Sequence, residues 1–366
     1  MKRLLFLANR DFVLYNFRFE LIKKLIENGN EVYIALPYGP KVDIMVKAGA
    51  RFVPLDIDGR GKNIFRDYKL LIMLKKIIRN VSPDVVLLYT TKIDLYGGIV
   101  AGKEGIPYII NVSGLGTAVG KKSFLQRFLI IMYKKAVENA NCVFFQNKYN
   151  RDFFHQKGIM PKKEHLIPGS GVNIEYWDYE EYPNEDNGIH FLFIARIIKE
   201  KGIDEYLHTA EELKKRSRHI FFHVIGPCDD KKYIKEIEEA QKKEIIQYHG
   251  MVEDTREYLR MAHCLIHPSY YPEGISNVCL EAAACGRPII TTDNPGCRDT
   301  VDDGVTGMIV PIQNCRVLIE KVNYFIQLDW EKKRRLGLMA RNKVVREYNR
   351  EIVVDKYMEE LNEIKV

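Results

Sequence analysis

The first half of the chain alternates short apolar runs with segments of helical periodicity. The apolar runs are bounded by turn residues, which is typical of strands buried on both faces of a sheet. The segments between them repeat apolar residues at the spacing of amphipathic helices. The predicted strands are Arg3–Leu7, Glu31–Leu36, Asp84–Leu88, Tyr108–Val112 and Cys142–Phe145, and the predicted helices are Phe17–Glu27, Tyr68–Arg79, Leu95–Lys103 and Phe124–Asn139. This alternation predicts a parallel sheet with helices on both faces.

The pattern weakens between Pro168 and Asn187, and we interpret 169–187 as an interdomain connection. Beyond it the predicted strands are His190–Ala195, Ile220–Ile225, Cys264–His267 and Pro288–Thr291, and the predicted helices are Ile203–Arg216, Lys231–Lys243, Glu253–Met261, Asn277–Cys285, Glu331–Tyr348 and Ile352–Ile364. The fold class is therefore α/β, with two doubly wound domains at 1–168 and 188–348. We expect 349–366 to form a C-terminal helix that packs back on the N-terminal domain.

Composition agrees with two globular domains, because 366 residues are too many for one ordinary core. The net charge of +7 fits an anionic ligand or membrane surface and is too small to indicate nucleic acid. Seven cysteines without a CxxC pair indicate buried thiols in a reducing cytosol. The apolar start ends at Asn9, which is too short for a leader peptide or a membrane span. We therefore expect a cytoplasmic protein.

Two glutamates flank a predicted loop-to-helix junction in the second domain. Glu273 lies in the Tyr-Tyr-Pro-Glu-Gly loop, Ser276 suits the N-cap, and Glu281 lies about one and a half turns inside the helix. Free amides at a helix start, here those of Ser276, Asn277 and Val278, attract phosphate. Carboxylates on either side accept hydrogen bonds from sugar hydroxyls. The arrangement predicts a ligand with hydroxyls at both ends and phosphate between them, which is the shape of a nucleotide-sugar.

A basic segment, Arg196-Ile-Ile-Lys-Glu-Lys201-Gly202, lies between a predicted strand and a predicted helix. Arg196 offers a planar fork of donors and Lys201 a point charge. Together they would neutralise a diphosphate leaving group. The alternative is a solvated basic loop, which the carboxylate pair in the same domain disfavours.

Two glycine-containing segments permit close backbone approach to a ligand. The segment Gly169–Asn173, which includes Gly171, is equally typical of a flexible linker. The segment Ser113-Gly114-Leu-Gly116-Thr resembles a phosphate loop, but it lacks the third glycine of GxGxxG because position 119 is valine.

Three further patterns have a structural and a functional interpretation. The stretch 121–135 is basic at both ends and apolar between, which fits a helix on an anionic membrane or a helix packed on its own sheet. The triplet Asp56-Ile-Asp58 is a DxD sequence, which we interpret as a surface loop. His267 precedes a proline, and we interpret it as a packed polar residue rather than a metal ligand.

These motifs resemble glycosyltransferase family 4, whose members have the GT-B fold. The resemblance rests on the Glu273/Glu281 pair, the Arg196/Lys201 pair and the Gly169–Asn173 segment. Further similar stretches are Val224–Pro227, His249–Val252, Pro295–Arg298 and Gly304–Gly307. The Gly114–Gly116 loop and the Tyr15–Arg18 segment are similar to bacterial members that build lipid-linked or surface polysaccharides. The resemblance implies two facing Rossmann-like domains with an interdomain cleft.

The same resemblance implies residue roles. Glu273 would contact the donor sugar, Glu281 the ribose, and Arg196 with Lys201 the diphosphate. The implied catalytic residues are Glu273, Arg196 and Lys201; the implied donor-binding residues are Glu281, Gly274, Ser276, Asn277, Val278, Gly171, Met251 and Val252; the implied acceptor-side residues are Gly114, Gly116, Arg18 and Ser113. The backbone near Met251 and Val252 would face the base.

As an activity, the resemblance implies a retaining enzyme that moves a hexose or N-acetylhexosamine from a nucleotide-sugar, UDP-linked, to a lipid-linked or surface-glycan acceptor. It implies no metal and no cofactor, with the departing phosphate helping to take the acceptor's proton. Peripheral contact with the inner face of the cytoplasmic membrane through 121–135 would accompany this activity, and no nucleic acid is expected.

One departure concerns the first domain, where many relatives carry a histidine near the glycine loop. Positions 111 to 113 are Asn, Val and Ser here, so Asn111 or Ser113 would take its place. Two other functions fit the motifs. A sugar-nucleotide epimerase would turn over the donor without an acceptor, and a non-catalytic partner would bind the donor and turn nothing over.

Overall fold

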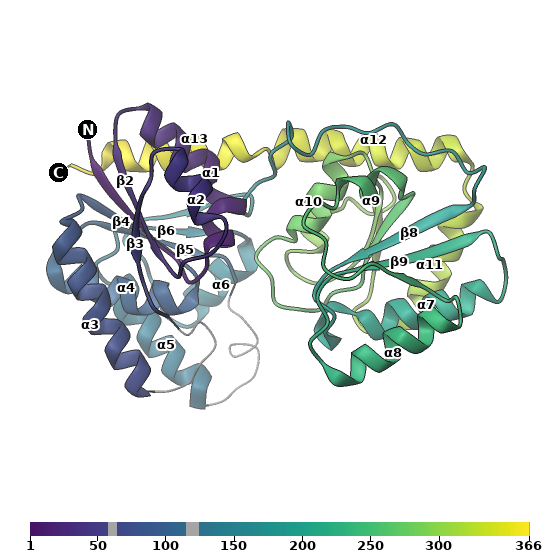
Figure 1. Ribbon diagram of the computed structural model, residues 1–366, viewed down its shortest axis with the longest axis horizontal. Helices are drawn as coiled ribbons and strands as arrows, with labels where there is room; N and C mark the ends of the chain where they lie inside the picture. The colour runs from purple at the N-terminus through teal and green to yellow at the C-terminus, as the bar shows by residue number, and fades with distance from the viewer. Residues whose placement is uncertain (58–63, 115–123, 366) are drawn as a thin grey trace. The chain divides into compact units, whose positions relative to one another are not determined.

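The computed structural model describes residues 1–57, 64–114 and 124–365, which form two units (Figure 1). Unit 1 comprises Met1–Ser170 together with the chain from Glu351 onward, and unit 2 comprises Gly171–Arg350. The final helix therefore packs with unit 1. The segment 171–187, which the sequence pattern suggests is a connection, belongs to unit 2.

Unit 1 is a seven-stranded parallel sheet in the order β3-β2-β1-β4-β5-β6-β7. Its strands are β1 Arg3–Leu7, β2 Glu31–Leu36, β3 Arg51–Pro54, β4 Val85–Tyr89, β5 Tyr108–Val112, β6 Cys142–Phe145 and β7 Glu164–Leu166. Its helices are α1 Asp11–Glu27, α2 Val42–Lys47, α3 Ile64–Val81, α4 Thr91–Glu104, α5 Phe124–Val137, α6 Lys148–Gln156 and α13 Arg350–Glu363.

Both faces of this sheet are buried, which explains why its central strands are continuously apolar. Leu5 and Leu7 of β1 join the core formed with α3, α4 and α5. Leu4 and Phe6 of the same strand join the core formed with α1 and α13. Successive side chains of a strand point to opposite faces, so one strand contributes to two cores.

Unit 2 is a six-stranded parallel sheet in the order β10-β9-β8-β11-β12-β13. Its strands are β8 Ile189–Ile194, β9 Ile220–Ile225, β10 Gln247–Tyr248, β11 Cys264–His267, β12 Ile289–Thr292 and β13 Gly307–Val310. Its helices are α7 Ile203–Lys214, α8 Lys231–Lys242, α9 Arg256–Met261, α10 Asn277–Ala284, α11 Cys315–Gln327 and α12 Trp330–Glu347, with 3₁₀ turns η1 Lys199–Lys201 and η2 Arg298–Thr300. As in unit 1, apolar cores cover both sheet faces.

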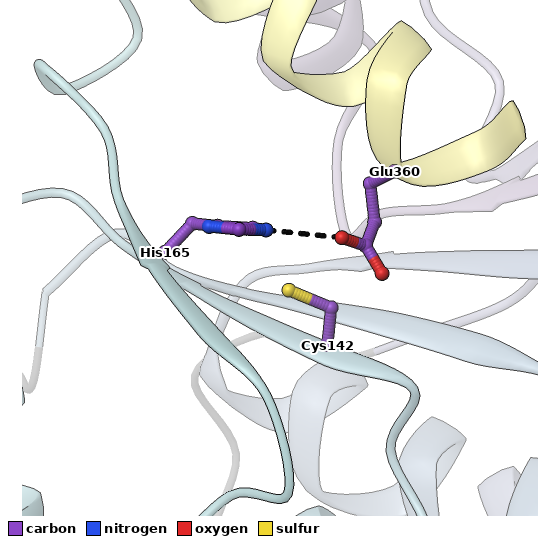
Figure 2. A group of neighbouring side chains, drawn as sticks. All are labelled: Cys142, His165 and Glu360. Atoms are coloured by element: carbon purple, nitrogen blue, oxygen red, sulfur yellow. Dashed lines mark hydrogen bonds and ion pairs between the residues drawn. The ribbon is translucent and has the colours of Figure 1, made fainter. Parts of the chain in front are cut away.

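A polar cluster joins α13 to the edge of the unit 1 sheet (Figure 2). The carboxylate of Glu360, 3% exposed, lies 3.0 Å from Nε2 of His165 on β7 and 2.7 Å from Nζ of Lys163. The thiol of Cys142 on β6 lies within 4.8 Å of both the imidazole and carboxylate ligand atoms. Because a lysine and a histidine already pair with this buried carboxylate, the cluster is explained as an ionic link that positions the C-terminal helix.

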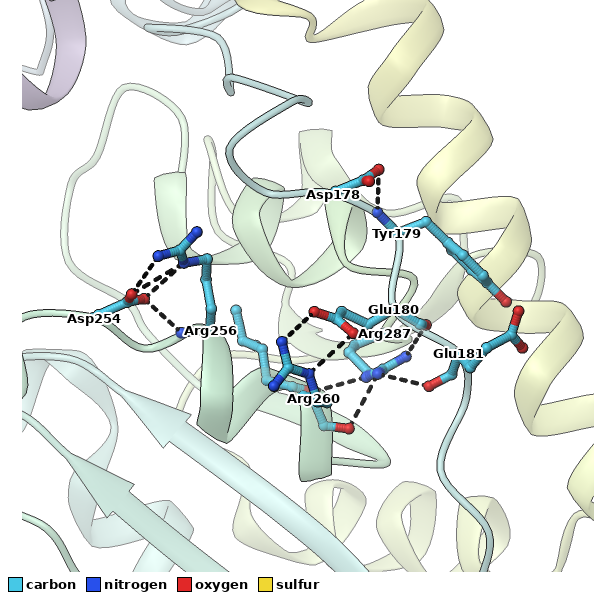
Figure 3. Close-up of polar contacts among 9 residues, drawn as sticks. Asp178, Tyr179, Glu180, Glu181, Asp254, Arg256, Arg260 and Arg287 are labelled. Carbon is cyan, nitrogen blue, oxygen red and sulfur yellow. Dashed lines mark hydrogen bonds and ion pairs between the residues drawn. The ribbon is translucent and has the colours of Figure 1, made fainter.

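Arginines bind the segment 171–187 to the rest of unit 2 (Figure 3). The buried guanidinium of Arg287 donates to the carbonyl oxygens of Glu180 and Glu181, both at 2.9 Å. Its Nε donates to the carbonyl of Leu259 at 2.7 Å, and Arg260 pairs with the Glu180 carboxylate at 2.8 Å. Arg287 thus satisfies the carbonyls of Glu180 and Glu181, which lie outside any strand or helix.

The central strands agree closely with the sequence pattern, whereas the sheet edges differ from it. The pattern does not include β3, β7, β10, β13, α2, α6 or α11. The edge strands are short or partly exposed, so they lack a continuous apolar run. Helix α1 begins at Asp11, six residues before the predicted start at Phe17.

Candidate active site

Three loops meet at the carboxyl edge of the unit 2 sheet, where β8, β11 and β12 lie side by side. The backbone N–H of Tyr270 donates to the carbonyl of Glu200 at 2.9 Å, which links the loop after β11 to η1. Nδ2 of Asn294, after β12, donates to the carbonyl of Tyr271 at 2.8 Å. This is the edge at which ligands bind in open α/β sheets.

Glycines allow these loops to approach one another closely. Gly202 ends η1 with φ +80°, and a Cβ there would lie 2.2 Å from the carbonyl oxygen of Pro268. Gly296 has φ +83°, and its Cβ would lie 2.3 Å from the carbonyl oxygen of Gly274. Both positions need a glycine for backbone angle and for space.

The ammonium of Lys201 contacts Oε1 of Glu273, so two of the predicted catalytic residues come together from different loops. Their side chains are 14% and 13% exposed. Burial opposes ionisation of Glu273, but the charges of Lys201 and His267 outweigh it and hold its pKa well below its usual value. Glu273 is therefore an ionised acceptor of hydrogen bonds at neutral pH.

Arg196 and Lys201 both contact the aromatic ring of Tyr271, a residue for which the sequence predicts no role. The guanidinium carbon of Arg196 is 5.5 Å from the ring centroid of Tyr271, and Nζ of Lys201 is 5.1 Å from that centroid. Both predicted diphosphate ligands thus gather around Tyr271. The signal in the sequence was the pair Tyr270-Tyr271 immediately before Pro272.

His267 is packed as predicted, and it also contacts Ser276 and lies near Glu273. It is 1% exposed at the end of β11, with Nε2 3.1 Å from Oγ of Ser276 and 3.9 Å from Oε1 of Glu273. Cys297 completes a group whose ligand atoms lie within 4.8 Å of one another. Because the ammonium of Lys201 already contacts Glu273, the group forms a compact network around this carboxylate.

Helix α10 begins at Asn277 with Ser276 at the N-cap position, but Ser276 does not cap the helix with its side chain. Its hydroxyl contacts His267, and its backbone N–H donates to the carbonyl of Gly296 at 2.9 Å. The prediction that three amides are free at this helix start is therefore wrong for Ser276, whose N–H is bonded. It leaves the first-turn amides of Asn277 and Val278. These amides point toward the helix N-terminus, where an anion is stabilised.

Glu281 lies farther along α10, in a separate group from Lys201 and Glu273. Burial raises its pKa to about 7, partly offset by the charge of Arg350. Arg350 donates to the carbonyl of Gly171 at 3.1 Å, and a Cβ on Gly171, at φ +65°, would lie 2.6 Å from Cα of Arg350. Gly171 thus packs against the chain near Glu281 instead of forming an unconstrained linker.

The two residues expected near the base follow β10. Met251 is 76% exposed, and Val252 is partly buried against the core that also contains α10. Gly274 is buried in the loop that carries Glu273. Unit 2 therefore contains all the predicted donor-side residues.

The predicted acceptor-side residues of unit 1 lie in different places. Arg18 is 2% exposed, with its guanidinium carbon 5.1 Å and 5.3 Å from the ring centroids of Tyr89 and Tyr357. It lies in the core between α1, β4 and α13, so its side chain is not exposed to an acceptor. Ser113 and Gly114 follow β5, and Gly116 lies outside the described residues. Asn111 is the last residue but one of β5 and is 2% exposed, with Oδ1 unpartnered.

The described part of the segment 121–135 is helix α5, which has two different faces. Tyr133 is buried in the core of unit 1, whereas Ile131 is 65% and Phe128 43% exposed. Lys121 and Lys122 lie outside the described residues, as does Asp58 of the DxD triplet. Across residues 1–57, 64–114 and 124–365, no helix combines the length and the apolar character that a membrane crossing requires.

Two Rossmann-like units, with Arg196, Lys201 and Glu273 gathered before helix α10 of the second, are typical of glycosyltransferases of the GT-B class. Family comparison agrees in both halves of the chain. The model of glycosyl transferases group 1 matches residues 178–343, and the model of glycosyl transferase 4-like proteins matches residues 3–147. The chain belongs to this glycosyltransferase family and is an enzyme.

Curated relatives are similar over nearly the whole length. The chain is 27% identical to the N,N'-diacetylbacillosaminyl-diphospho-undecaprenol alpha-1,3-N-acetylgalactosaminyltransferase of Campylobacter jejuni, with 97% of each chain covered. It is 23% identical to the capsular polysaccharide biosynthesis glycosyltransferase CapM of Staphylococcus aureus, with 91% of this chain and 90% of the relative covered.

Solved structures share the fold at lower identity. Anabaena HepE in complex with UDP and glucose superposes with a TM-score of 0.81 at 16% identity, covering 99% of this chain and 100% of that one. The structure of TarM gives a TM-score of 0.78 at 12% identity, with 99% of both chains covered. These similarities establish the GT-B architecture.

Proposed function

We propose that this glycosyltransferase transfers a hexose or N-acetylhexosamine, with retention and without a metal, from a UDP-sugar to a lipid-linked or surface-glycan acceptor. The proposal depends chiefly on the contact between Lys201 and Glu273 at the carboxyl edge of the unit 2 sheet. That contact brings a cation and an ionised acid together, which supports a site for phosphate next to sugar hydroxyls. The relatives named above, one acting on a diphospho-undecaprenol substrate and one in capsule synthesis, support the acceptor class.

In this proposal the chain's residues act mainly by charge and position. Arg196 and Lys201 stabilise the negative charge that grows on the leaving diphosphate, which is a transition-state effect. Glu273 accepts hydrogen bonds from the donor sugar, and Glu281 accepts them from the ribose. As the sugar–phosphate bond breaks and the new glycosidic bond forms, the leaving phosphate oxygen takes the proton of the acceptor hydroxyl. Atoms and charges balance without a protein nucleophile.

Replacing Lys201 tests this role, with Lys199 as a matched control on the same 3₁₀ turn. We expect Lys201→Met to lower kcat about 100-fold while the donor KM changes only a few fold, because the charge is needed most in the transition state. Lys199→Met should leave both constants unchanged. Steady-state nucleotide release measures this, and a thermal unfolding curve checks that each variant is folded. Equal losses in kcat and donor affinity would indicate simple ground-state binding.

The same assay separates the alternative functions. Nucleotide release that requires an acceptor and persists in EDTA supports a metal-independent transferase. Donor turnover without acceptor indicates an epimerase, and donor binding without turnover indicates a non-catalytic partner. Activity that is lost in EDTA and restored by a divalent cation would contradict metal independence and direct attention to His267, Glu273 and Cys297. A donor at 100 times its Kd adds about 2.7 kcal/mol of stability, so thermal shift identifies the sugar.

A further inference from the structure

The N-terminus of helix α10 lacks the side-chain cap that its sequence offers. Serine is a preferred N-cap residue, because its hydroxyl oxygen accepts a hydrogen bond from the N–H of the second or third helical residue. Those residues are Val278 and Cys279 here, and Ser276 makes no such bond. Within the described part of the chain, the N–H groups of Asn277, Val278 and Cys279 make no hydrogen bond. The helix start therefore presents three donors in search of an acceptor.

His267 holds the hydroxyl that could cap the helix. Oγ of Ser276 lies 3.1 Å from Nε2 of His267, the last residue of β11. His267 is 1% exposed, and among the described residues its Nδ1 has no hydrogen-bond partner. If the hydroxyl turned to the helix, both ring nitrogens would be buried without a hydrogen bond, which is costly. Burial of the imidazole therefore decides the competition for the hydroxyl in favour of His267.

Backbone contacts fix both residues in this arrangement. The N–H of Ser276 donates to the carbonyl of Gly296 at 2.9 Å. Oγ1 of Thr291 donates to the carbonyl of His267 at 2.8 Å, and these two residues are paired in parallel register. With the backbone fixed on both sides, the Ser276 hydroxyl can change partners only by rotation of its side chain between staggered positions.

We propose that His267 is a positioning residue for donor binding: by holding the Ser276 hydroxyl, it keeps the amides of Val278 and Cys279 open to the donor's diphosphate. The inference rests on the proposed function, which it deepens by giving a role to a residue that need not touch the substrate. Free amides and the helix dipole attract an anion to a helix start. A serine cap would compete with the diphosphate for the same N–H groups, so the donor would have to displace it.

Calorimetric titration of UDP into the full chain tests this role with a double-mutant cycle. We expect His267→Leu to weaken UDP binding about fivefold, because the released hydroxyl caps the helix and a cap is worth about 1 kcal/mol. Ser276→Ala should bind UDP as tightly as the parent, because its helix has no hydroxyl to cap it. The double variant His267→Leu/Ser276→Ala should regain the parent's affinity. His267→Gln is the matched control, because its amide can hold the hydroxyl, and it should leave the affinity unchanged.

Recovery in the double variant separates positioning from packing. A double variant that binds UDP as weakly as His267→Leu alone would show that His267 acts through packing or through Glu273, and it would overturn the proposal. Unchanged UDP binding in His267→Leu would overturn it as well. A thermal unfolding curve checks that each variant is folded, and His267→Met is a second replacement without a ring nitrogen if the leucine variant does not fold.

A crystal structure of His267→Leu without nucleotide tests the same competition independently of the donor. Oγ of Ser276 within hydrogen-bond distance of the N–H of Val278 or Cys279 would support the proposal, and an Oγ that still points toward position 267 would overturn it. Failure of the parent chain to bind any nucleoside diphosphate would count against the proposed function, whereas normal UDP binding by the parent without the pattern of the double-mutant cycle would count against the role of His267 alone.

Discussion

At the scale of single residues, burial decides what the charged and polar groups of unit 2 can do. Lys201 and Glu273 tolerate their low exposure because each is the ionic partner of the other. Four histidines of unit 2 show the opposite case, in which burial favours the uncharged form. His190, His223 and His249 are linked in a row by contacts of 2.9 Å and 3.0 Å between ring nitrogens, and the N–H of His190 donates to Nδ1 of His263 at 3.1 Å. Nδ1 of His263 accepts this bond from the backbone of His190 while its Nε2 lies 3.0 Å from the carbonyl of Asn184, so His263 makes both bonds only as a neutral ring.

This histidine row predicts acid sensitivity of unit 2. Burial lowers the pKa of His223 to about 3, with further lowering from its two neighbouring imidazoles and Lys214, and burial lowers the pKa of His263 to about 4. The unfolded chain titrates near 6.5. Below that pH the unfolded state binds more protons, so stability is lost as pH falls from 6.5 toward these folded-state values. A fully depressed histidine costs about 1.4 kcal/mol at pH 5.5.

Urea unfolding at pH 7.5 and pH 5.5 measures this loss. We expect the difference between the two pH values to shrink in His223→Gln, because the variant cannot take up the proton. The exposed His219 is the matched control, and His219→Gln should keep the full difference. An identical pH dependence in His223→Gln and in the parent would show that the row does not control acid stability.

At the scale of elements, the short helix α10 and the loops around it form the site because backbone groups cross-link them. Ser276 and Gly296 are joined by a backbone hydrogen bond, and Tyr270 by another to η1. The segment 171–187 is held in the same way by the guanidinium of Arg287. Loops joined through main-chain and buried side-chain contacts hold catalytic groups more firmly than independent loops would.

Gly296 tests how much this cross-linking matters. Gly296→Ala places a methyl group against the carbonyl of Gly274 and strains a left-handed φ, so we expect a loss of about 2–4 kcal/mol in unfolding free energy and weaker donor binding. Gly304→Ala isolates the backbone strain, because Gly304 has φ +75° and no atom within 4 Å of its added Cβ. It should cost about 1 kcal/mol and leave donor binding unchanged. Similar losses in both variants would contradict close loop packing at Gly296.

At the scale of the whole molecule, the exposed face of α5 is a candidate membrane-binding surface. Arg127, Phe128, Ile131, Lys134 and Lys135 are all exposed, and their spacing places them along one side of the helix. The buried side, with Tyr133 in the core, satisfies the packing interpretation. The packing interpretation therefore holds for the buried face, and the membrane interpretation stays a prediction for the exposed face. The exposed apolar and basic combination fits the surface of an anionic membrane.

Vesicle sedimentation checks this contact. We expect the full chain to bind vesicles that contain phosphatidylglycerol, and Phe128→Ser/Ile131→Ser to reduce the bound fraction at least severalfold, because two apolar side chains no longer enter the interface. Tyr324→Ser removes a comparably exposed aromatic of unit 2 and should not change binding. Unchanged vesicle binding in the α5 variant would leave packing as the only role of this helix.

The apolar pattern of the sequence was enough to predict the central strands and the parallel α/β class. The charged residues at the predicted loop-to-helix junctions, together with the family resemblance, pointed to Lys201, Glu273 and Glu281. A strand buried on both faces needs a continuous apolar run, so the run identifies it without any knowledge of its neighbours. The strands β3, β7 and β10 could not be found in this way, because partial exposure removes that constraint. The edge strand β13 is mostly buried, but with four residues it is too short to give a clear apolar run.

Tertiary structure alone decided which groups meet. Lys201 and Glu273 are separated by 72 residues, and their contact depends on β8 and β11 pairing in one sheet. The burial of Arg18, the row of histidines and the use of the Ser276 hydroxyl by His267 likewise arise from neighbours distant in sequence. Sequence determines each residue's chemistry and its local conformation, but partners and burial, which set charge state and hydrogen bonding, arise only when separate elements pack together.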